Sequence, residues 1–80
     1  MRVSIRSLEK GILFEGEAIS VNAKTVAGEI TVLNNHLPLM GILTKGNLVV
    51  ENTEEKKESF HVNSGFLEVG ALNTVMALLD

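Results

Sequence analysis

The sequence lacks cysteine, tryptophan and tyrosine, and these absences exclude several classes of chemistry. Without cysteine the chain can form no disulfide, no thiolate metal site and no cysteine nucleophile. Its only aromatic residues are three phenylalanines, and its net charge is −3. It therefore has few rings to stack on bases and no excess of positive charge to attract phosphates. We expect no nucleic-acid partner.

Long apolar runs are also missing. The first residues, Met1 to Arg6, alternate between apolar and polar side chains and contain no uninterrupted apolar stretch of the kind found in a secretory signal. No window approaches the roughly 20 apolar residues that a membrane-spanning helix requires. The sequence therefore predicts no direct membrane span, and any membrane role should be indirect.

The length and composition are those of one small folded domain. The chain has 80 residues, of which 45% are hydrophobic and 21% charged, a balance typical of globular rather than disordered chains. We expect a single domain over residues 1–80. A chain this short buries a smaller share of its surface than a larger domain does. We therefore expect it to be marginally stable alone and to depend on a partner.

The strongest positive signal is alternation with a period of two residues, which indicates β-strands. It recurs at Val3–Ile5, Ile19–Ala23, Ile30–Val32, Leu48–Val50, Phe60–Val62, Leu67–Val69 and Val75–Leu79. Turn-forming pairs separate these segments: Lys10-Gly11, Glu15-Gly16, Ala27-Gly28, Asn34-Asn35, Lys45-Gly46, Ser64-Gly65, and Gly70 with Asn73. The pattern predicts an all-β fold, a small two-sheet antiparallel β-sandwich of about eight to ten short strands.

The same alternation predicts which side chains form the core. We expect the inward set to include Ile5, Ile19, Val21, Ile30, Val32, Val50, Phe60, Val62, Leu67, Val69 and Val75. No ten-residue stretch carries a clean helical stripe. The best helical candidate, residues 37–43, is interrupted by Pro38 and Gly41.

Candidates for catalysis are few. His61 lies between Phe60 and Val62, so alternation places it on the exposed face of a strand, and His36 follows a turn where a local hydrogen bond is expected. Ser64, His61 and Glu68 could form a triad on paper, but closeness in sequence says nothing about triad geometry, and no nucleophile-elbow motif is present. No phosphate-binding glycine run and no metal-ligand spacing occur. We expect no catalytic residues, no metal and no cofactor, and hence no enzyme.

The most charged segment, residues 52–59, is expected to be a solvated hairpin tip. A lipoyl-type carrier would present one lysine in such a turn. Here the adjacent pair Lys56 and Lys57 lies among Glu54, Glu55 and Glu58, which departs from a single lysine in a tight turn. A small β-sandwich adaptor or binding module remains an open alternative.

Three blocks of the chain resemble the ATP synthase epsilon subunit. They are Gly28–Leu39 (GEITVLNNHLPL), Ser64–Val69 (SGFLEV) and Asn73–Asp80 (NTVMALLD), in the family's order and at similar separations. The resemblance covers the chain from about Val3 to Asp80. Departures fall in turns: Asn34-Asn35 stands where a turn with proline is usual, Thr44 precedes Lys45-Gly46 where the family has proline, and Ser64 replaces a glycine. Such residues are acceptable in turns.

The resemblance implies a fold and a function. It implies a single epsilon-type β-sandwich domain that is a non-catalytic central-stalk subunit of the rotor of a proton-translocating ATP synthase. Such a domain binds the gamma subunit and the proton-carrying ring of the membrane sector, and it couples proton flow to ATP synthesis. Its place would be peripheral, at the cytoplasmic face of the inner (plasma) membrane. Most members continue into a two-helix hairpin beyond the position of Asp80, so we expect residues 1–80 alone neither to bind ATP nor to inhibit the synthase.

The resemblance also implies two interfaces. The ring-facing residues would be Lys24, Gly28, Glu29 and Thr31, and the gamma-subunit interface would be His36, Leu37, Pro38, Leu39 and Met40. The residues themselves allow simpler interpretations. Gly28 and Glu29 can be turn residues exposed to solvent, and the apolar segment from Leu37 to Leu43 can be ordinary core. An unbroken apolar segment with proline and glycine is hard to bury on one side only, however, and a flexible methionine suits an adaptable contact.

Overall fold

The computed structural model describes the whole chain, Met1–Asp80, as nine strands without a helix. The strands are β1 (Arg2–Ser7), β2 (Gly11–Glu17), β3 (Ser20–Thr25), β4 (Gly28–Leu33), β5 (Leu39–Leu43), β6 (Gly46–Glu51), β7 (Lys57–Val62), β8 (Gly65–Gly70) and β9 (Thr74–Leu79). The prediction of an all-β fold is therefore confirmed.

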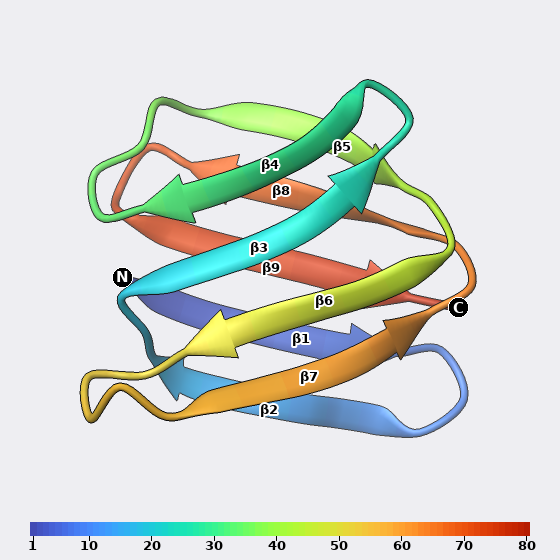
Figure 1. The fold of residues 1–80 in the computed structure, drawn as a ribbon, viewed down its shortest axis with the longest axis horizontal. Coiled ribbons are helices and arrows are strands. Elements are labelled where there is room, and N and C mark those ends of the chain that lie inside the picture. Colours follow the sequence, from blue (N-terminus) through green and yellow to red (C-terminus); the bar gives the residue numbers. More distant parts are fainter.

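The strands form two layers that are parts of one curled sheet. The hydrogen-bonded order is β2-β1-β9-β8-β5-β3-β6-β7, and β4 pairs with β3. Figure 1 shows β4, β3, β6 and β7 lying over β5, β8, β9, β1 and β2. The layers are joined where the end of β3 meets β5 at a single pair, Thr25 with Leu43. The result is the predicted sandwich, closed by hydrogen bonds along one side.

One ladder is parallel, which corrects the expectation of a fully antiparallel sandwich. Strand β1 pairs with β9 in parallel, with Val3 opposite Val75 and Ile5 opposite Ala77. Alternation specifies which face a side chain occupies but not the direction of the neighbouring strand. Parallel pairing needs a long connection between the two strands, and here nearly the whole chain lies between them.

Two strands were not predicted, and one predicted turn is wrong. Gly16 lies inside β2 opposite Val3 rather than in a turn, and the Phe14 ring lies beside the position that its side chain would take. Alternation is broken in β2 because the register with β1 shifts between Ile5 and Arg6. Strand β5 was missed because it has apolar residues at every position except Gly41.

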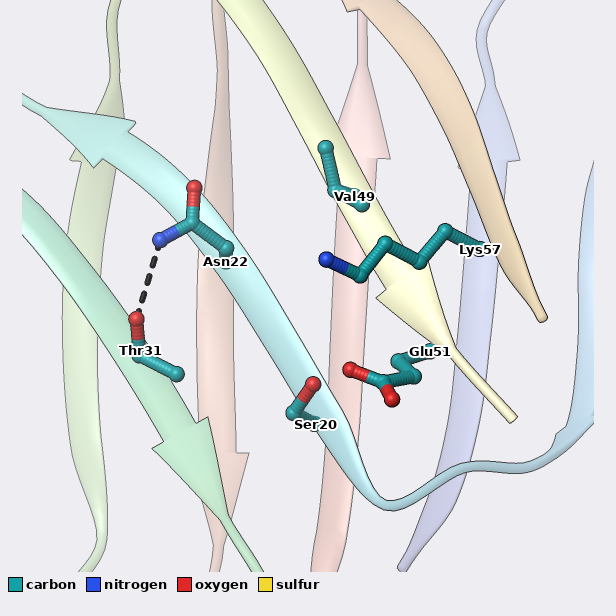
Figure 2. A pocket seen from close by; sticks show the side chains of 6 residues that line it. All are labelled: Ser20, Asn22, Thr31, Val49, Glu51 and Lys57. Atoms are coloured by element: carbon teal, nitrogen blue, oxygen red, sulfur yellow. Dashed lines mark hydrogen bonds between the residues drawn. The ribbon is translucent and has the colours of Figure 1, made fainter. Parts of the chain in front are cut away.

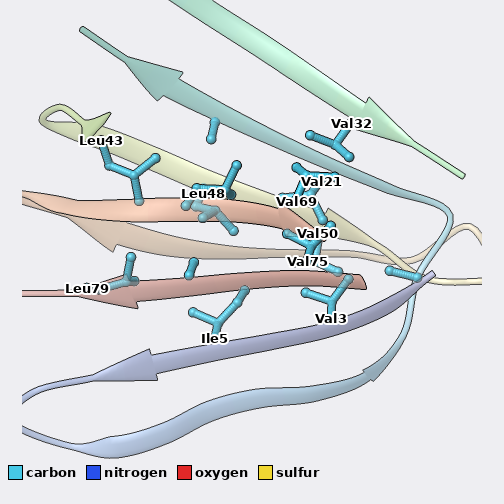
Figure 3. Close-up of a cluster of buried hydrophobic side chains, with 14 of the residues drawn as sticks. Val3, Ile5, Val21, Val32, Leu43, Leu48, Val50, Val69, Val75 and Leu79 are labelled. Atoms are coloured by element: carbon cyan, nitrogen blue, oxygen red, sulfur yellow. The ribbon is translucent and has the colours of Figure 1, made fainter. Parts of the chain in front are cut away.

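The core lies between the two layers (Figure 3). It consists of Met1, Val3, Ile5, Ala18, Val21, Ala23, Val32, Leu43, Leu48, Val50, Val62, Leu67, Val69, Val75, Ala77 and Leu79. Most of the predicted core residues are among them, but three are only half-buried: Ile19, Ile30 and Phe60. Ile19 lies in the link before β3, and the other two lie in edge strands. Phe60 packs edge-on against Phe14 with ring centroids 6.3 Å apart, which covers the side where β7 and β2 do not pair.

One end of the sandwich is held by a hydrogen-bond network. The Met1 ammonium group donates to the carbonyl oxygen of Ala18 (2.9 Å) and to Oδ1 of Asn34 (2.6 Å). Asn73 Oδ1 accepts from the Asn35 N–H (2.7 Å), and Asn73 Nδ2 donates to Asn34 Oδ1 (3.4 Å). Asn35 and Asn73 both have positive φ, a conformation that asparagine tolerates. The network fixes the connection between β4 and β5.

Candidate interaction surfaces

The hairpin of β3 and β4 is braced from within by Thr25. Its hydroxyl donates to the Gly28 carbonyl oxygen (2.8 Å) and accepts from the Ala27 N–H (3.1 Å). Thr25 is the only polar residue among the 17 buried residues of the protein. Gly28 has a φ of 123° with open space where a side chain would project, as expected of a turn glycine. The turn is therefore held by side-chain as well as backbone hydrogen bonds.

Three of the four predicted ring-facing residues share the outer face of this hairpin. Lys24 lies opposite Glu29, and Asn22 lies opposite Thr31. Asn22 Nδ2 donates to Glu29 Oε2 (3.0 Å) and to Thr31 Oγ1 (2.9 Å), and Figure 2 shows the second bond. Gly28 lies at the start of β4. Asn22 was not predicted, although its outward position two residues before Lys24 was a usable signal.

The outer face continues into an open polar hollow of about 300 Å³. It is lined by Ser20, Asn22, Thr31, Val49, Glu51 and Lys57. Lys57 reaches from β7 across β6, and its register partner is Glu51 (Figure 2). The residues come from four strands and are mostly polar, so this face can contact a polar surface without burying unpaired groups.

The predicted gamma interface starts in the connection between β4 and β5. His36, Leu37 and Pro38 are exposed, with Leu37 at 79%. The His36 N–H donates to the Leu33 carbonyl oxygen (3.2 Å), and its ring bonds through Nδ1 to the Leu37 carbonyl oxygen (2.7 Å). The local hydrogen-bonding role expected of His36 is confirmed. These bonds, with the network at Asn34 and Asn73, hold an apolar tip in a fixed place.

The interface residues that follow belong to β5. Leu39 is half-buried against the core, whereas Met40 is 69% exposed. The simpler interpretation of the whole segment as core is therefore wrong, since only part of it is buried. Next to Met40 lies an apolar groove of about 400 Å³, lined by Thr25, Val26, Ala27, Ile30, Leu39, Met40, Gly41 and Ile42. Val26 and Ile42 lie in the two segments expected to make contacts but were not among the named interface residues, and their meeting in one groove depends on strand neighbours that the sequence does not reveal.

The polar groups considered for catalysis do not converge. Ser64 Oγ donates to Asp80 Oδ2 (3.0 Å), and His61 Nε2 bonds to Asn63 Oδ1 (3.2 Å). Glu68 lies in β8 opposite Met40 of β5. His61 is exposed in its strand, as predicted. No group of three or more histidine, aspartate or glutamate side chains is placed to hold a metal ion. No helix in the structure has the length and apolarity needed to cross a membrane.

The predicted tip, residues 52–59, is confirmed for residues 52–56, which connect β6 to β7, whereas residues 57–59 are already part of β7. Asn52 Oδ1 accepts from the N–H groups of Glu54 (2.9 Å) and Lys56 (3.1 Å), and Glu55 has a φ of 63°. The turn is thus built by Asn52, and Lys57 is already the first residue of β7. The two lysines therefore differ in setting, which is not the arrangement of a single presented lysine.

The chain is similar to known proteins along most of its length. The family model described as the ATP synthase delta/epsilon chain, beta-sandwich domain, matches residues 1–78. The ATP synthase epsilon chain of Micrococcus luteus is 35% identical over 77 residues, which are 96% of this chain and 84% of that one. The epsilon chain of Hydrogenovibrio crunogenus is 42% identical over 69 residues, covering 86% of this chain and 46% of that one.

Solved structures agree. A chain in the mitochondrial ATP synthase of Euglena gracilis, in an assembly titled OSCP/F1/c-ring, superimposes with a TM-score of 0.88 at 25% identity, covering 96% of this chain and 48% of that one. A chain from the Tetrahymena thermophila central stalk/c-ring assembly gives 0.82 at 25% identity, covering 99% and 62%. The present chain spans about half the length of several curated relatives, such as 45% of that from Dichelobacter nodosus. On the match along nearly its whole length, the chain belongs to the family of ATP synthase delta/epsilon-chain β-sandwich domains.

Proposed function

We propose that this chain is a non-catalytic central-stalk subunit of a proton-translocating ATP synthase, binding the gamma subunit and the proton-carrying ring. The relatives named epsilon chain and the neighbours from stalk and c-ring assemblies support this role. The observation that carries it is the presence of two chemically different exposed surfaces, one polar and one apolar, on a single rigid sandwich. A part that links two other bodies needs two such surfaces.

The gamma subunit is assigned to residues His36, Leu37, Pro38, Leu39 and Met40. Leu37 and Met40 expose apolar side chains on a backbone that is already fixed, so binding costs little ordering entropy. Apolar anchors at the centre of an interface usually carry most of its affinity. This surface would therefore supply the main attachment of the domain to the stalk.

The ring is assigned to Lys24, Gly28, Glu29 and Thr31. Exposed charges on this hairpin can pair with charged polar loops of the ring, but each such pair contributes only about 0–1 kcal/mol. The contact would set orientation and specificity more than affinity. Joined to gamma on one surface and to the ring on the other, the domain would pass rotation between them and couple proton flow to ATP synthesis. It would thus be held peripherally at the cytoplasmic face of the inner (plasma) membrane.

Calorimetric titration of purified gamma subunit tests this function. We expect Leu37→Ser to weaken binding about tenfold or more, as loss of an interface anchor does. The matched control is Leu8→Ser, because Leu8 is 74% exposed but lies after β1 at the opposite end of the sandwich (Figure 1). Wild-type protein that does not bind gamma would favour the alternative, an unrelated β-sandwich adaptor. Equal losses in both variants would move the interface elsewhere.

A further inference from the structure

We propose that the gamma-binding surface receives an extended, uncharged segment of the gamma subunit, which adds as a strand to the free edge of β5. This inference rests on the proposed function, since it specifies how the gamma subunit is held. Three features of the structure carry it: unpaired backbone groups on β5, the absence of charge along this edge, and the apolar groove beside it.

The backbone of β5 is hydrogen-bonded along one edge only. On one side it pairs with β8 along its whole length, from Leu39 opposite Val69 to Leu43 opposite Gly65. On the other side it meets β3 only at the single Thr25–Leu43 pair. Most of this second edge is therefore open to another strand.

One hydrogen bond shows which backbone N–H and C=O groups of β5 point toward the open edge. The Val26 N–H donates to the Ile42 carbonyl oxygen (2.9 Å) on the edge away from β8, and no bond returns from the Ile42 N–H to Val26. Backbone groups of residues two apart in a strand point to the same edge. The N–H and C=O of Met40 and the N–H of Ile42 therefore face the open edge without a strand partner.

This edge lacks the protection that the other edges carry. Free edges invite pairing with another chain, and natural proteins block them with charged side chains. The other outer strands are charged: β2 contains Glu15 and Glu17, β4 contains Glu29, and β7 contains Lys57 and Glu58. Strand β5 has the sequence LMGIL, with no charge at all. Among the strands with an open edge, β5 alone carries no charged side chain that would hinder pairing with another strand.

The groove beside β5 selects the chemistry of the occupant. Val26, Met40 and Ile42 are 67%, 69% and 62% exposed, and no charged residue lines the groove of about 400 Å³. A segment that complements it in charge is therefore neutral and apolar. A helix would leave the β5 groups unpaired because its own backbone bonds are internal. An extended strand pairs with them and places alternate side chains in the groove, as in strand addition.

Proline substitution at Met40 in the full chain tests the inference. Because the Met40 N–H faces away from β8, Met40→Pro removes a donor from the open edge and no bond from the β5–β8 ladder. We expect it to weaken gamma binding about tenfold, because a buried acceptor on gamma would lose its donor. Met40→Ala keeps the N–H and is the matched control: it loses the same side-chain contact but no backbone bond, so it should weaken binding clearly less than Met40→Pro. Thermal unfolding of each isolated variant reports whether it is folded.

Hydrogen exchange on the unmodified proteins provides a measurement that needs no variant. The Met40 and Ile42 amides should exchange freely in the isolated chain and become protected in the complex with gamma. If they exchange equally fast in the complex, or if Met40→Ala weakens binding as much as Met40→Pro, gamma is held by side chains and strand addition is wrong, while the proposed function stands. If the unmodified chain does not bind gamma, the proposed function fails first and takes this inference with it.

Discussion

The β3–β4 hairpin and the open edge of β5 are neighbours, but they expose chemically different groups to solvent. On the hairpin, Asn22 bonds to Glu29 and Thr31, and the Thr25 hydroxyl bonds across the turn to Ala27 and Gly28. On β5 the exposed side chains are apolar and part of the backbone has no partner. The polar side chains of the hairpin are hydrogen-bonded to each other, whereas β5 exposes apolar side chains and backbone groups that only a partner can cover.

This difference separates two roles that an interface can have. Polar groups already paired with each other gain little from a new partner, so they contribute mainly to orientation and specificity. Apolar groups and unpaired backbone groups gain from being covered, so they contribute affinity. Substitutions on the two surfaces, and in the core beneath them, should therefore differ in both size and kind.

The largest effect is expected below the apolar surface. Leu67 of β8 lies opposite Gly41 of β5 and is fully buried. Leu67→Ala should lower the free energy of unfolding by about 2–5 kcal/mol through lost burial and a residual cavity. Ile42→Ala, one residue along β5 and 62% exposed, should change it by no more than about 0.5 kcal/mol. Urea denaturation of both variants checks this. Similar losses would show that the outer face of β5 already supports the isolated fold.

A smaller loss of stability is expected inside the hairpin. Thr25→Val keeps the shape of the side chain but removes the hydroxyl that bonds to Gly28 and Ala27. Leaving these partly buried backbone groups unpaired should cost about 1–3 kcal/mol, measured by the same denaturation. Thr25→Ser retains the hydroxyl and serves as the control. A Thr25→Val variant as stable as the parent would mean that water replaces the hydroxyl, and that the turn does not depend on the Thr25 hydrogen bonds.

Alternation in the sequence predicted strands that have one buried face and one solvent-exposed face. In β3, Val21 and Ala23 alternate with Asn22 and Lys24, and the structure buries the first pair and leaves the second pair on the outer face. Strand β5 has no such contrast, so alternation could not identify it. The parallel pairing of β1 with β9 was equally hidden, because the pattern of inward residues is the same for either strand direction.

The interaction surfaces were predictable only where one hairpin defines them. Lys24 and Glu29 face each other because the turn between them sets the register of β3 and β4, and alternation places both outward. The groove, by contrast, brings Val26 of one turn beside Met40 and Ile42 of a later strand. That neighbourhood depends on how β3 crosses from one layer to the other, which is a property of the whole fold.

The smallest effect is expected at Glu29, on the hydrogen-bonded outer face of the β3–β4 hairpin. Glu29→Gln keeps an oxygen that can accept from Asn22 and removes only the charge. The free energy of unfolding should change by no more than about 0.5 kcal/mol. If Glu29 pairs with a basic loop of the ring, the affinity of the assembled domain for the ring should fall by about 0–1 kcal/mol, and the difference should shrink as salt is raised. A loss that does not depend on salt would contradict an ion pair.

Because that change in affinity is small, position gives the sharper test. A Glu29→Cys variant should form a disulfide with a cysteine placed in the ring loop of the assembled enzyme, since Glu29 is exposed on the β3–β4 hairpin. Glu55→Cys is the matched control, because Glu55 is also exposed but lies in the tip between β6 and β7, at the other end of the sandwich (Figure 1). Disulfide formation at Glu29→Cys alone places the hairpin against the ring. If only Glu55→Cys reacts, the domain is docked the other way up, and the polar hairpin would face away from the membrane.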